Sequence, residues 1–389
     1  MRTPDIPTNE STVRVGGRIP ALTGMRWWAA LLVFFYHAAI GPLIFPEPQN
    51  LFGQFTLTLL DPGGGLGVSF FFVLSGFVLT WSARAGDTPV RIWRRRAVKI
   101  YPNHLAVCFL AIGVMLATGF TDQLHHVLPT LLLVQTWTPD FWAAVGVNGV
   151  SWSLACELLF YVCFPLWIWL ITKIRPERLW YWACAVIAAV MLVPAVATLL
   201  PDTPKLLWAP MSAPEYWFAY KFPVPRMLEF VLGILLARIV MTGRWINLPL
   251  RAAWALMAVG YVVAMFSPPL FRLVGATIIP IALLIPALAT RDLRGGRTLL
   301  GSRTMVWLGN ISFAFYLFHR MVLEYTVRAF GEDFQWNLGW ALAATLIALL
   351  VTTLLAAALF EFFEKPIYRR FSEPRRKVAE PVPQPESAR

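Results

Sequence analysis

Long apolar runs separated by short basic loops dominate the chain. A helix that crosses the hydrocarbon core of a bilayer needs about 20 mostly apolar residues. The run 127–137 is too short to cross and is expected to lie along the interface or to re-enter. Ten other segments approach the required length: 20–43, 65–82, 100–119, 153–172, 179–200, 225–241, 252–267, 271–290, 305–326 and 338–361. The pattern predicts an all-α, polytopic membrane helix bundle of about ten transmembrane helices.

The basic residues alternate with these segments in a way that predicts topology. Lys and Arg gather in the cytoplasmic loops of membrane proteins. With a cytoplasmic N-terminus, 26 of the 33 Lys and Arg residues fall in segments predicted to be inside, and the outer loops 44–64 and 120–152 contain none. Both termini are therefore predicted to be cytoplasmic. The chain divides into a cytoplasmic segment 1–18, a membrane domain 19–370 and a charged tail 371–389 that is expected to be disordered.

Composition supports lipid as the main solvent of the chain. Of its 389 residues, 58% are hydrophobic and 14% are charged, whereas soluble domains carry about 25% charged residues. The net charge of +12 is explained by basic loops, and no nucleic-acid partner is expected. The four cysteines lie in apolar runs without a CxxC pair, so neither a disulfide nor a metal site is expected. The first apolar run holds an arginine and a histidine and is interpreted as a retained helix, not a cleaved signal peptide.

Ionisable residues inside the apolar runs are the first candidates for a site, because a charge at the bilayer centre costs about 2.5–3.5 kcal/mol on insertion scales. Arg26 and His37 are eleven residues apart. On a helix this places them on one face, about 16 Å apart along the axis. The helix would offer an anion-binding group near the cytoplasmic end and a titratable base deeper in the membrane. The alternative is a snorkelling arginine with a neutral, hydrogen-bonded histidine.

A basic cluster, RIWRRRAVKIYP, leads into the third apolar run. Such clusters are common topology signals at cytoplasmic helix ends. As a site, Arg96 and Lys99 lie three residues apart and can bind one phosphate together. Tyr101, near the end of the same cluster, is assigned to substrate contact.

Two further runs carry polar side chains on one helical face. Glu157 lies inside the fourth run with Tyr161 one turn later, and it is expected to orient a histidine, pair with a cation or act as a base. Ser312, Tyr316 and His319 form a polar stripe along the ninth run, and such a stripe faces protein or water instead of lipid.

The glycine-rich sequence DPGGGLGVSFFFVLSGF does not fit a nucleotide-binding loop. It lacks GxxxxGK followed by Ser or Thr, and no strand precedes it. We interpret Ser75-Gly76 as a site of close helix packing. Neither a GxSxG elbow nor an HExxH motif occurs in the sequence.

Five segments, in this order, resemble the acyltransferase-3 family of bacterial membrane acyltransferases. They are LTGMRWWAALLVFFYHA, GVSFFFVLSGFVLTW, RRAVKIYP, SWSLACELLFYVCFPL and ISFAFYLFHRMV. The resemblance implies a ten-helix bundle that transfers acyl groups, often acetyl, from acyl-CoA to hydroxyls of surface sugars, lipid-linked glycans or natural products such as macrolides. The compact size is similar to the macrolide O-acyltransferase branch of actinomycetes.

Matched to the family's motifs, the residues above fall into three groups. Catalysis is assigned to His37, Glu157 and His319, acyl-CoA binding to Arg26, Arg96 and Lys99, and substrate contact to Tyr101, Tyr161, Ser312 and Tyr316. At two positions the chain departs from the family. Arginine is common where this chain has Lys99, which keeps the charge but loses bidentate geometry. Ser69 stands where an acidic residue is often found.

The resulting hypothesis places acyl-CoA at the cytoplasmic face, with its pantetheine arm running along the first helix towards His37. His37 would be the general base on the acceptor hydroxyl. His319 is a rival base or a relay member, and an acyl-histidine intermediate is a further route. Some relatives carry a C-terminal hydrolase-like domain, which this chain does not show. It is therefore expected either to transfer the acyl group directly or to pass it to a separate extracytoplasmic protein.

Two other functional classes stay open from the sequence. Membrane histidines and carboxylates also suit a proton-coupled transporter, although the internal repeats and paired broken helices of transporters are not evident. A scaffold that presents a partner enzyme is the third class. The sequence does not determine the acceptor, the acyl chain length, the side of the membrane on which the acceptor is modified, or the oligomeric state.

Overall fold

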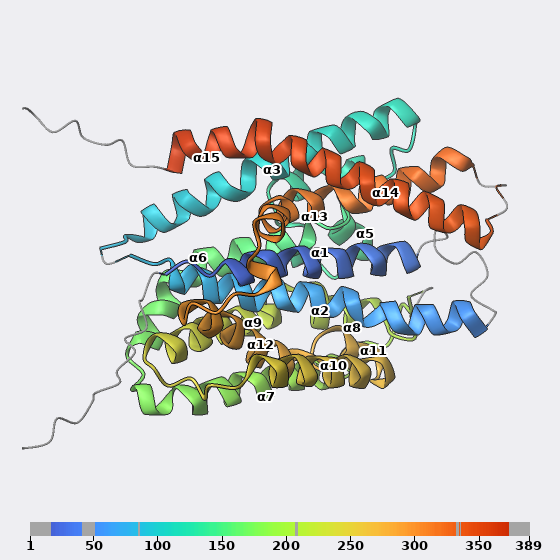
Figure 1. Ribbon diagram of the computed structural model, residues 1–389. Coiled ribbons are helices and arrows are strands. Elements are labelled where there is room, and N and C mark those ends of the chain that lie inside the picture. Colours follow the sequence, from blue (N-terminus) through green and yellow to red (C-terminus); the bar gives the residue numbers. More distant parts are fainter. Residues whose placement is uncertain are drawn as a thin grey trace, which may run out of the picture.

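The computed structural model describes residues 17–40, 51–84, 86–206, 209–331, 334 and 336–372. These residues form an all-α bundle, as predicted, in which long helices run side by side along one direction (Figure 1). The predicted cytoplasmic segment 1–18 and the predicted disordered tail 371–389 lie almost wholly outside the described residues.

Ten long helices in the described part correspond to the ten predicted segments. They are α1 (Pro20–Ile40), α2 (Leu51–Trp81), α3 (Pro89–Thr118), α6 (Trp152–Thr172), α7 (Leu179–Ala197), α9 (Pro223–Met241), α10 (Leu250–Phe266), α12 (Ile278–Leu293), α13 (Arg303–Phe330) and α14 (Leu338–Leu359). The connections contain α4 (Val127–Leu131), α5 (Phe141–Val145), α8 (Ala213–Tyr216), α11 (Pro269–Leu273), α15 (Lys365–Ser372), the 3-10 turns η1 (Leu124–His126), η2 (Gln135–Trp137), η3 (Pro176–Arg178) and η5 (Leu299–Gly301), and the π-helical turns η4 (Trp217–Lys221) and η6 (Phe360–Glu364).

Seven helical segments of the described chain are long and apolar enough to cross a membrane. α1, α9 and α10 are not among them. α10 has 17 residues, and α1 and α9 carry charged or titratable side chains within their apolar runs. The structure is therefore a polytopic membrane bundle, while the count of ten crossings and the cytoplasmic placement of both termini stay predictions.

Three predicted helix boundaries are wrong. α2 begins at Leu51 instead of 65, because the glycine run packs against α1 instead of ending the helix; a Cβ at Gly64 would lie 2.5 Å from the Tyr36 ring. α3 begins at Pro89, where Thr88 caps it. The predicted helix 271–290 is divided into α11 and α12.

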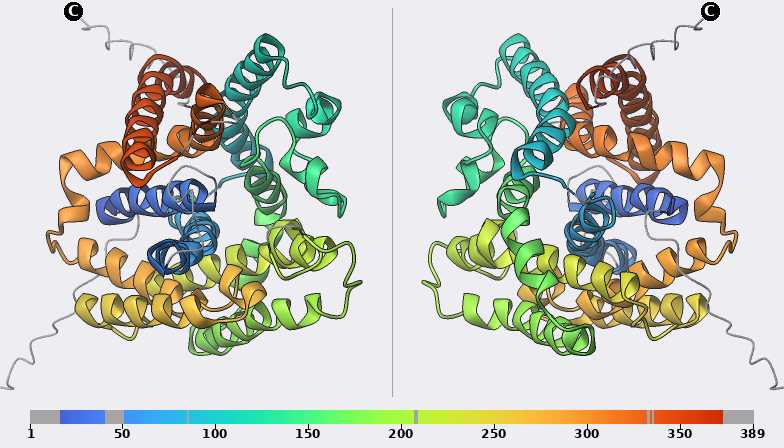
Figure 2. Two further views of the ribbon diagram at one scale, coloured as in Figure 1. Left: turned by 90° about the vertical axis from the view of Figure 1, so that its right-hand side faces the viewer. Right: turned by 90° about the vertical axis from the view of Figure 1, so that its left-hand side faces the viewer.

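Helix α1 lies inside the bundle between α2 and α13 (Figures 1 and 2). The contact with α13 is close, because a Cβ at Gly309 would lie 1.9 Å from the Thr23 carbonyl oxygen. Deeper along the same contact, the rings of Trp27 and Phe315 are 4.9 Å apart. Close packing on two sides fixes the direction in which the polar side chains of α1 point.

Contacts at the two ends of the bundle agree with the predicted alternation. At one end, hydrogen bonds or ion pairs join residues of predicted inside segments, or of the inside ends of predicted spans: Trp81 with Gly17, Ala21 with Asp292, and Arg244 with Glu177. At the other end, two residues of the predicted outer loop 44–64 contact later spans: Asp61 pairs with Arg272, at the outer end of the predicted span 271–290, and Leu59 accepts from Tyr261 of the predicted span 252–267. Helices that follow one another along the chain, such as α1 and α2, therefore run in opposite directions, whereas α1 and α13 pack side by side and run in the same direction.

Candidate active site

Two histidines from distant helices meet inside the bundle. His37 comes from α1 and His319 from α13, and Nε2 of His319 lies 3.0 Å from Nδ1 of His37. His319 is fully buried, and its Nδ1 lies 2.6 Å from the carbonyl oxygen of Tyr316. His37 Nδ1 also lies 3.0 Å from the carbonyl oxygen of Val33. The two histidines that the sequence singled out separately are thus one hydrogen-bonded pair.

The hydrogen-bond network assigns the protons of this pair. A carbonyl oxygen can only accept, so His319 Nδ1 carries a hydrogen and donates it to Tyr316. In the neutral ring, His319 Nε2 is then an acceptor, and the single hydrogen of His37 Nδ1 is shared between it and the Val33 carbonyl oxygen. The lone pair of neutral His37 therefore lies on Nε2, which pairs with none of the described residues. This is the arrangement of a general base oriented by a second group.

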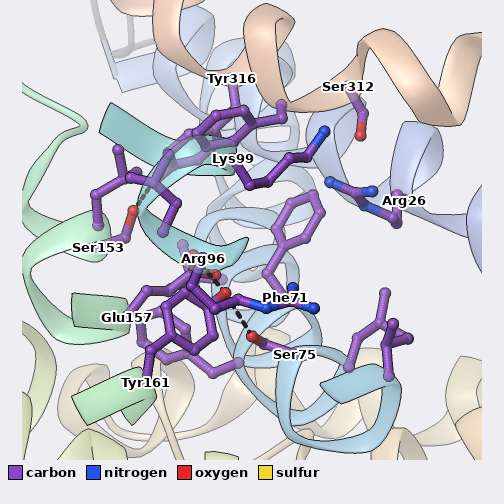
Figure 3. Close-up of a pocket in the computed structure, with 17 residues that line it drawn as sticks. Arg26, Phe71, Ser75, Arg96, Lys99, Ser153, Glu157, Tyr161, Ser312 and Tyr316 are labelled. Atoms are coloured by element: carbon purple, nitrogen blue, oxygen red, sulfur yellow. Dashed lines mark hydrogen bonds between the residues drawn. The ribbon is translucent and has the colours of Figure 1, made fainter. Parts of the chain in front are cut away.

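A cavity of about 140 Å³ is lined by basic side chains from α1 and α3, together with other polar and apolar residues (Figure 3). Its lining includes Arg26, Ser75, Arg96, Lys99, Ser153, Glu157, Tyr161, Ser312 and Tyr316, together with apolar side chains such as Phe71. In Figure 3, Arg26 and Lys99 point towards the same space beside Ser312. The cavity therefore brings together five predicted polar residues from α1, α3 and α6 and two from α13.

The basic cluster of α3 is divided between structural contacts and the cavity. Arg95 donates two hydrogen bonds to Asp87, which hold the pKa of that carboxyl down at about 2. Arg94 donates to the carbonyl oxygen of Phe371 in α15. Arg96 and Lys99 instead line the cavity. A role as a topology signal therefore does not account for the whole cluster, because Arg96 and Lys99 also line the cavity.

A hydrogen-bonded chain forms one wall of the cavity. The Tyr161 hydroxyl donates to Glu157 at 3.0 Å and lies 2.8 Å from the Ser75 hydroxyl (Figure 3). Arg96 lies 5.6 Å above the Tyr161 ring. Glu157 was expected to orient a histidine, pair with a cation or act as a base; its observed partner is Tyr161, and it shares the cavity with Arg26 and Arg96.

Tyr316 separates the cavity from the histidine pair. Its hydroxyl lies 2.9 Å from the Ser153 hydroxyl at the cavity wall, and its ring centroid lies 5.4 Å from that of His319. Phe71 packs edge-on against the same tyrosine at 6.1 Å. Neither histidine lines the cavity. A group bound in the cavity would therefore have to pass Tyr316 to reach the histidine pair.

Tyr101 does not line this cavity. It borders a smaller, mostly apolar space of about 110 Å³ between α3 and α6, which shares Arg96 and Tyr161 with the main cavity. Trp93 closes one side of this space by donating to the Tyr161 carbonyl oxygen at 3.1 Å. The substrate contact assigned to Tyr101 would therefore have to be made from the neighbouring space.

Glu364 is the main residue that the sequence analysis missed. It is 4% exposed, forms an ion pair with Lys99 and accepts a hydrogen bond from Asn103. It follows the last apolar run, where charged residues normally mark the end of a membrane helix. A glutamate among aromatic residues, FEFFEKP, was the available signal.

Ser69 belongs to a buried charged cluster outside the cavity. Arg226 and Glu229 of α9 are both fully buried and pair at 3.0 Å, and Arg226 donates to the Ser69 hydroxyl at 3.3 Å. The guanidinium lies 5.0 Å from the Phe72 ring and 5.2 Å from the Tyr220 ring. In this chain the carboxylate beside Arg226 therefore comes from α9, while position 69 on α2 supplies a hydroxyl.

The described residues contain no group of three or more His, Cys, Asp or Glu side chains placed to hold a metal ion. The residues present at this site offer a base, a set of cations and a series of hydroxyls.

Comparison with known proteins identifies the family. Residues 19–360 match the model of a family described as an acyltransferase domain. The chain belongs to this acyltransferase family. It is 42% identical to acyltransferase MdmB of Streptomyces mycarofaciens over 95% of this chain and 97% of that protein. The chain is therefore an acyltransferase enzyme, as predicted, and these relatives give no support to a transporter or a scaffold.

More distant relatives are named for work on cell-surface polymers. Exopolysaccharide production protein ExoZ of Rhizobium meliloti is 27% identical over 79% of this chain and 90% of that protein. Putative peptidoglycan O-acetyltransferase YrhL of Bacillus subtilis is 25% identical over 91% of this chain, which spans 56% of that protein. No solved structure matches the chain.

Proposed function

We propose that this protein is an acyl-CoA-dependent O-acyltransferase of the plasma (inner) membrane that moves an acetyl group to a hydroxyl of a natural product such as a macrolide, or of a sugar. The observation that carries the proposal is the His37–His319 pair, with its one-way hydrogen-bond order, beside a cavity lined by three cations. The pair suits proton removal from a hydroxyl, and the cations suit a phosphorylated donor.

The donor binds with its phosphates at the basic end of the cavity. Arg26, Arg96 and Lys99 provide charge-assisted donors there, and such bonds are roughly twice as strong as neutral ones. The apolar wall that includes Phe71 accommodates the pantetheine arm, which extends towards Tyr316. In this pose the thioester lies at the inner end of the cavity against Tyr316, and it has to pass this side chain to reach His37.

The chemical step is direct transfer. Nε2 of His37 takes the proton of the acceptor hydroxyl, and the acceptor oxygen attacks the thioester carbonyl carbon. The C–S bond breaks, and the CoA sulfur leaves and takes the proton from His37. His319 keeps the His37 ring in the tautomer with a free Nε2 and accepts from its Nδ1 while the ring is charged. No metal and no second protein is required for this sequence.

The acceptor is proposed from the relatives. The 42% identity to a Streptomyces acyltransferase spans nearly both chains, and the sequence resembles the macrolide O-acyltransferase branch. We therefore place a macrolide first and sugar hydroxyls second.

The test is acceptor-dependent release of free CoA by the purified protein in nanodiscs. Acetyl-CoA is supplied with a panel that contains macrolides, free sugars and lipid-linked glycans. Release that requires one acceptor class supports the proposal and identifies that class. A folded protein that releases no CoA with any member of the panel, and binds no CoA, would contradict it.

A donor-binding prediction follows for Arg26. Arg26→Ala should raise the KM for acetyl-CoA by on the order of tenfold to a hundredfold, because a hydrogen bond to a charged group contributes about 1.5–3 kcal/mol. Arg18→Ala is the matched control, since Arg18 is exposed near the start of the same helix and does not line the cavity. Equal KM values for both variants would place the donor phosphates elsewhere.

A further inference from the structure

The π-helical turn η6 places a carboxylate inside the bundle. The buried face of α14 includes Thr352 and Ala356. Counting about 100° per residue from Ala356, a regular α-helix would place residue 363 about 20° from this face and residue 364 about 80° from it. The extra residue of a π-turn shifts this phase by one position. Accordingly, Glu364 is 4% exposed, whereas Phe363 is 38% exposed.

The inward carboxylate holds two residues of α3. Glu364 pairs with Lys99 through one oxygen and accepts from the Asn103 amide through the other. Lys99 and Asn103 lie one turn apart, and Asn103 is fully buried. Arg26 also interacts electrostatically with Glu364. The carboxylate therefore lies behind the cationic wall of the cavity and is not part of its lining.

Lys99 keeps donor capacity towards the cavity while it is held. An ammonium group has three N–H donors, of which Glu364 uses one. In Figure 3 the Lys99 amine points towards Arg26 and Ser312. A lysine side chain loses rotamer entropy when it is ordered. Glu364 removes much of that cost before a ligand arrives.

We propose that Glu364 is a positioning residue for donor binding: it fixes the Lys99 ammonium at the cavity wall so that its free N–H groups bind a donor phosphate. This inference rests on the proposed function, because it takes the cavity as the site of acyl-CoA. The opposite role is competition, in which Glu364 occupies Lys99 in place of a phosphate. The two roles predict changes of opposite sign when the carboxylate is removed.

The variants are Glu364→Gln, Glu364→Asp and the control Glu361→Gln. Glu361 lies in the same π-turn, pairs with Lys365 and is about one-third exposed. Each variant is assayed as full-length protein in nanodiscs with acetyl-CoA and with acetyl-pantetheine, a thioester that lacks phosphate. CoA binding is measured directly in parallel by calorimetry.

Glu364→Gln should weaken CoA binding and raise the KM for acetyl-CoA by about tenfold, the effect of losing one charge-assisted hydrogen bond, with kcat nearly unchanged. Acetyl-pantetheine turnover should stay at the wild-type level, which also shows that the variant is folded. Glu364→Asp should recover part of the affinity, and Glu361→Gln should match the wild type.

Two outcomes overturn the inference. Tighter CoA binding by Glu364→Gln would establish competition, and an affinity equal to that of Glu361→Gln would leave Lys99 independent of Glu364. Failure of the proposed function is a separate result, since it appears in the wild-type protein as absence of CoA binding and release.

Discussion

Replacing His37 by alanine should reduce acyl transfer by on the order of a thousandfold, the usual contribution of a general base. His319 donates to the Tyr316 carbonyl oxygen and accepts from Nδ1 of His37. The nitrogen that keeps an available lone pair is therefore Nε2 of His37. Alanine leaves no group at that position to take the acceptor proton. The measurement is the rate of acetyl transfer from labelled acetyl-CoA, with folding checked by size-exclusion chromatography.

Control variants distinguish loss of the general base from a loss of activity caused by misfolding. His125→Ala removes an exposed histidine of the 3-10 turn η1 and should leave the rate unchanged. At His319, glutamine keeps an oxygen that can accept from His37 Nδ1, whereas leucine does not. His319→Gln should therefore retain more activity than His319→Leu. Equal loss in both variants would mean that His319 acts as a base itself.

Glu229→Gln should lower the free energy of unfolding by about 3–5 kcal/mol, the cost of leaving a buried charge without its partner. Arg226 and Glu229 are fully buried, so Arg226 cannot reach water when the carboxylate is removed. The measurement is thermal unfolding in detergent, followed by a thiol-reactive dye. Cys156 is fully buried and reports opening of the bundle, whereas Cys184 is exposed and sets the baseline.

Glu177→Gln is the matched control for that experiment. Glu177 pairs with Arg244 at 2.6 Å, but its side chain is 60% exposed, so the loss should be below about 1 kcal/mol. The double change Arg226→Met with Glu229→Gln should recover stability, because it removes the buried charge that was left unpaired. If Glu229→Gln and Glu177→Gln lowered stability equally, Arg226 would not depend on Glu229.

The long helices could be predicted because each is encoded by a local run of apolar residues. Each long helix coincides with an apolar run, and His37 and His319 stood out because ionisable groups are costly in such runs. Their contact was not predictable, since it depends on how α1 crosses α13. The start of α2 was predicted wrongly because glycines normally disfavour a helix. Here Gly64 instead lets α2 approach Tyr36 closely.

The burial of two carboxylates could not be predicted from the sequence, for a different reason. Glu364 follows an apolar run, and its inward direction depends on a π-turn that shifts the helix phase. Glu229 lies three residues after Arg226, which looks like a local ion pair of a short helix. Its burial becomes visible only when α9 is packed against α2, where a Cβ at Gly76 would lie 2.0 Å from the Phe230 carbonyl oxygen. That close crossing confirms the packing role predicted for Ser75-Gly76.

The central claim is that one protein joins an acyl-CoA thioester to an acceptor hydroxyl at the His37–His319 pair. The most direct test measures free CoA and O-acetylated acceptor together, by thiol assay and mass spectrometry, for the wild type and His37→Ala in the same nanodisc preparation. The account predicts equal amounts of CoA and ester from the wild type, and neither above background from His37→Ala. Ester formed by His37→Ala at the wild-type rate would contradict it.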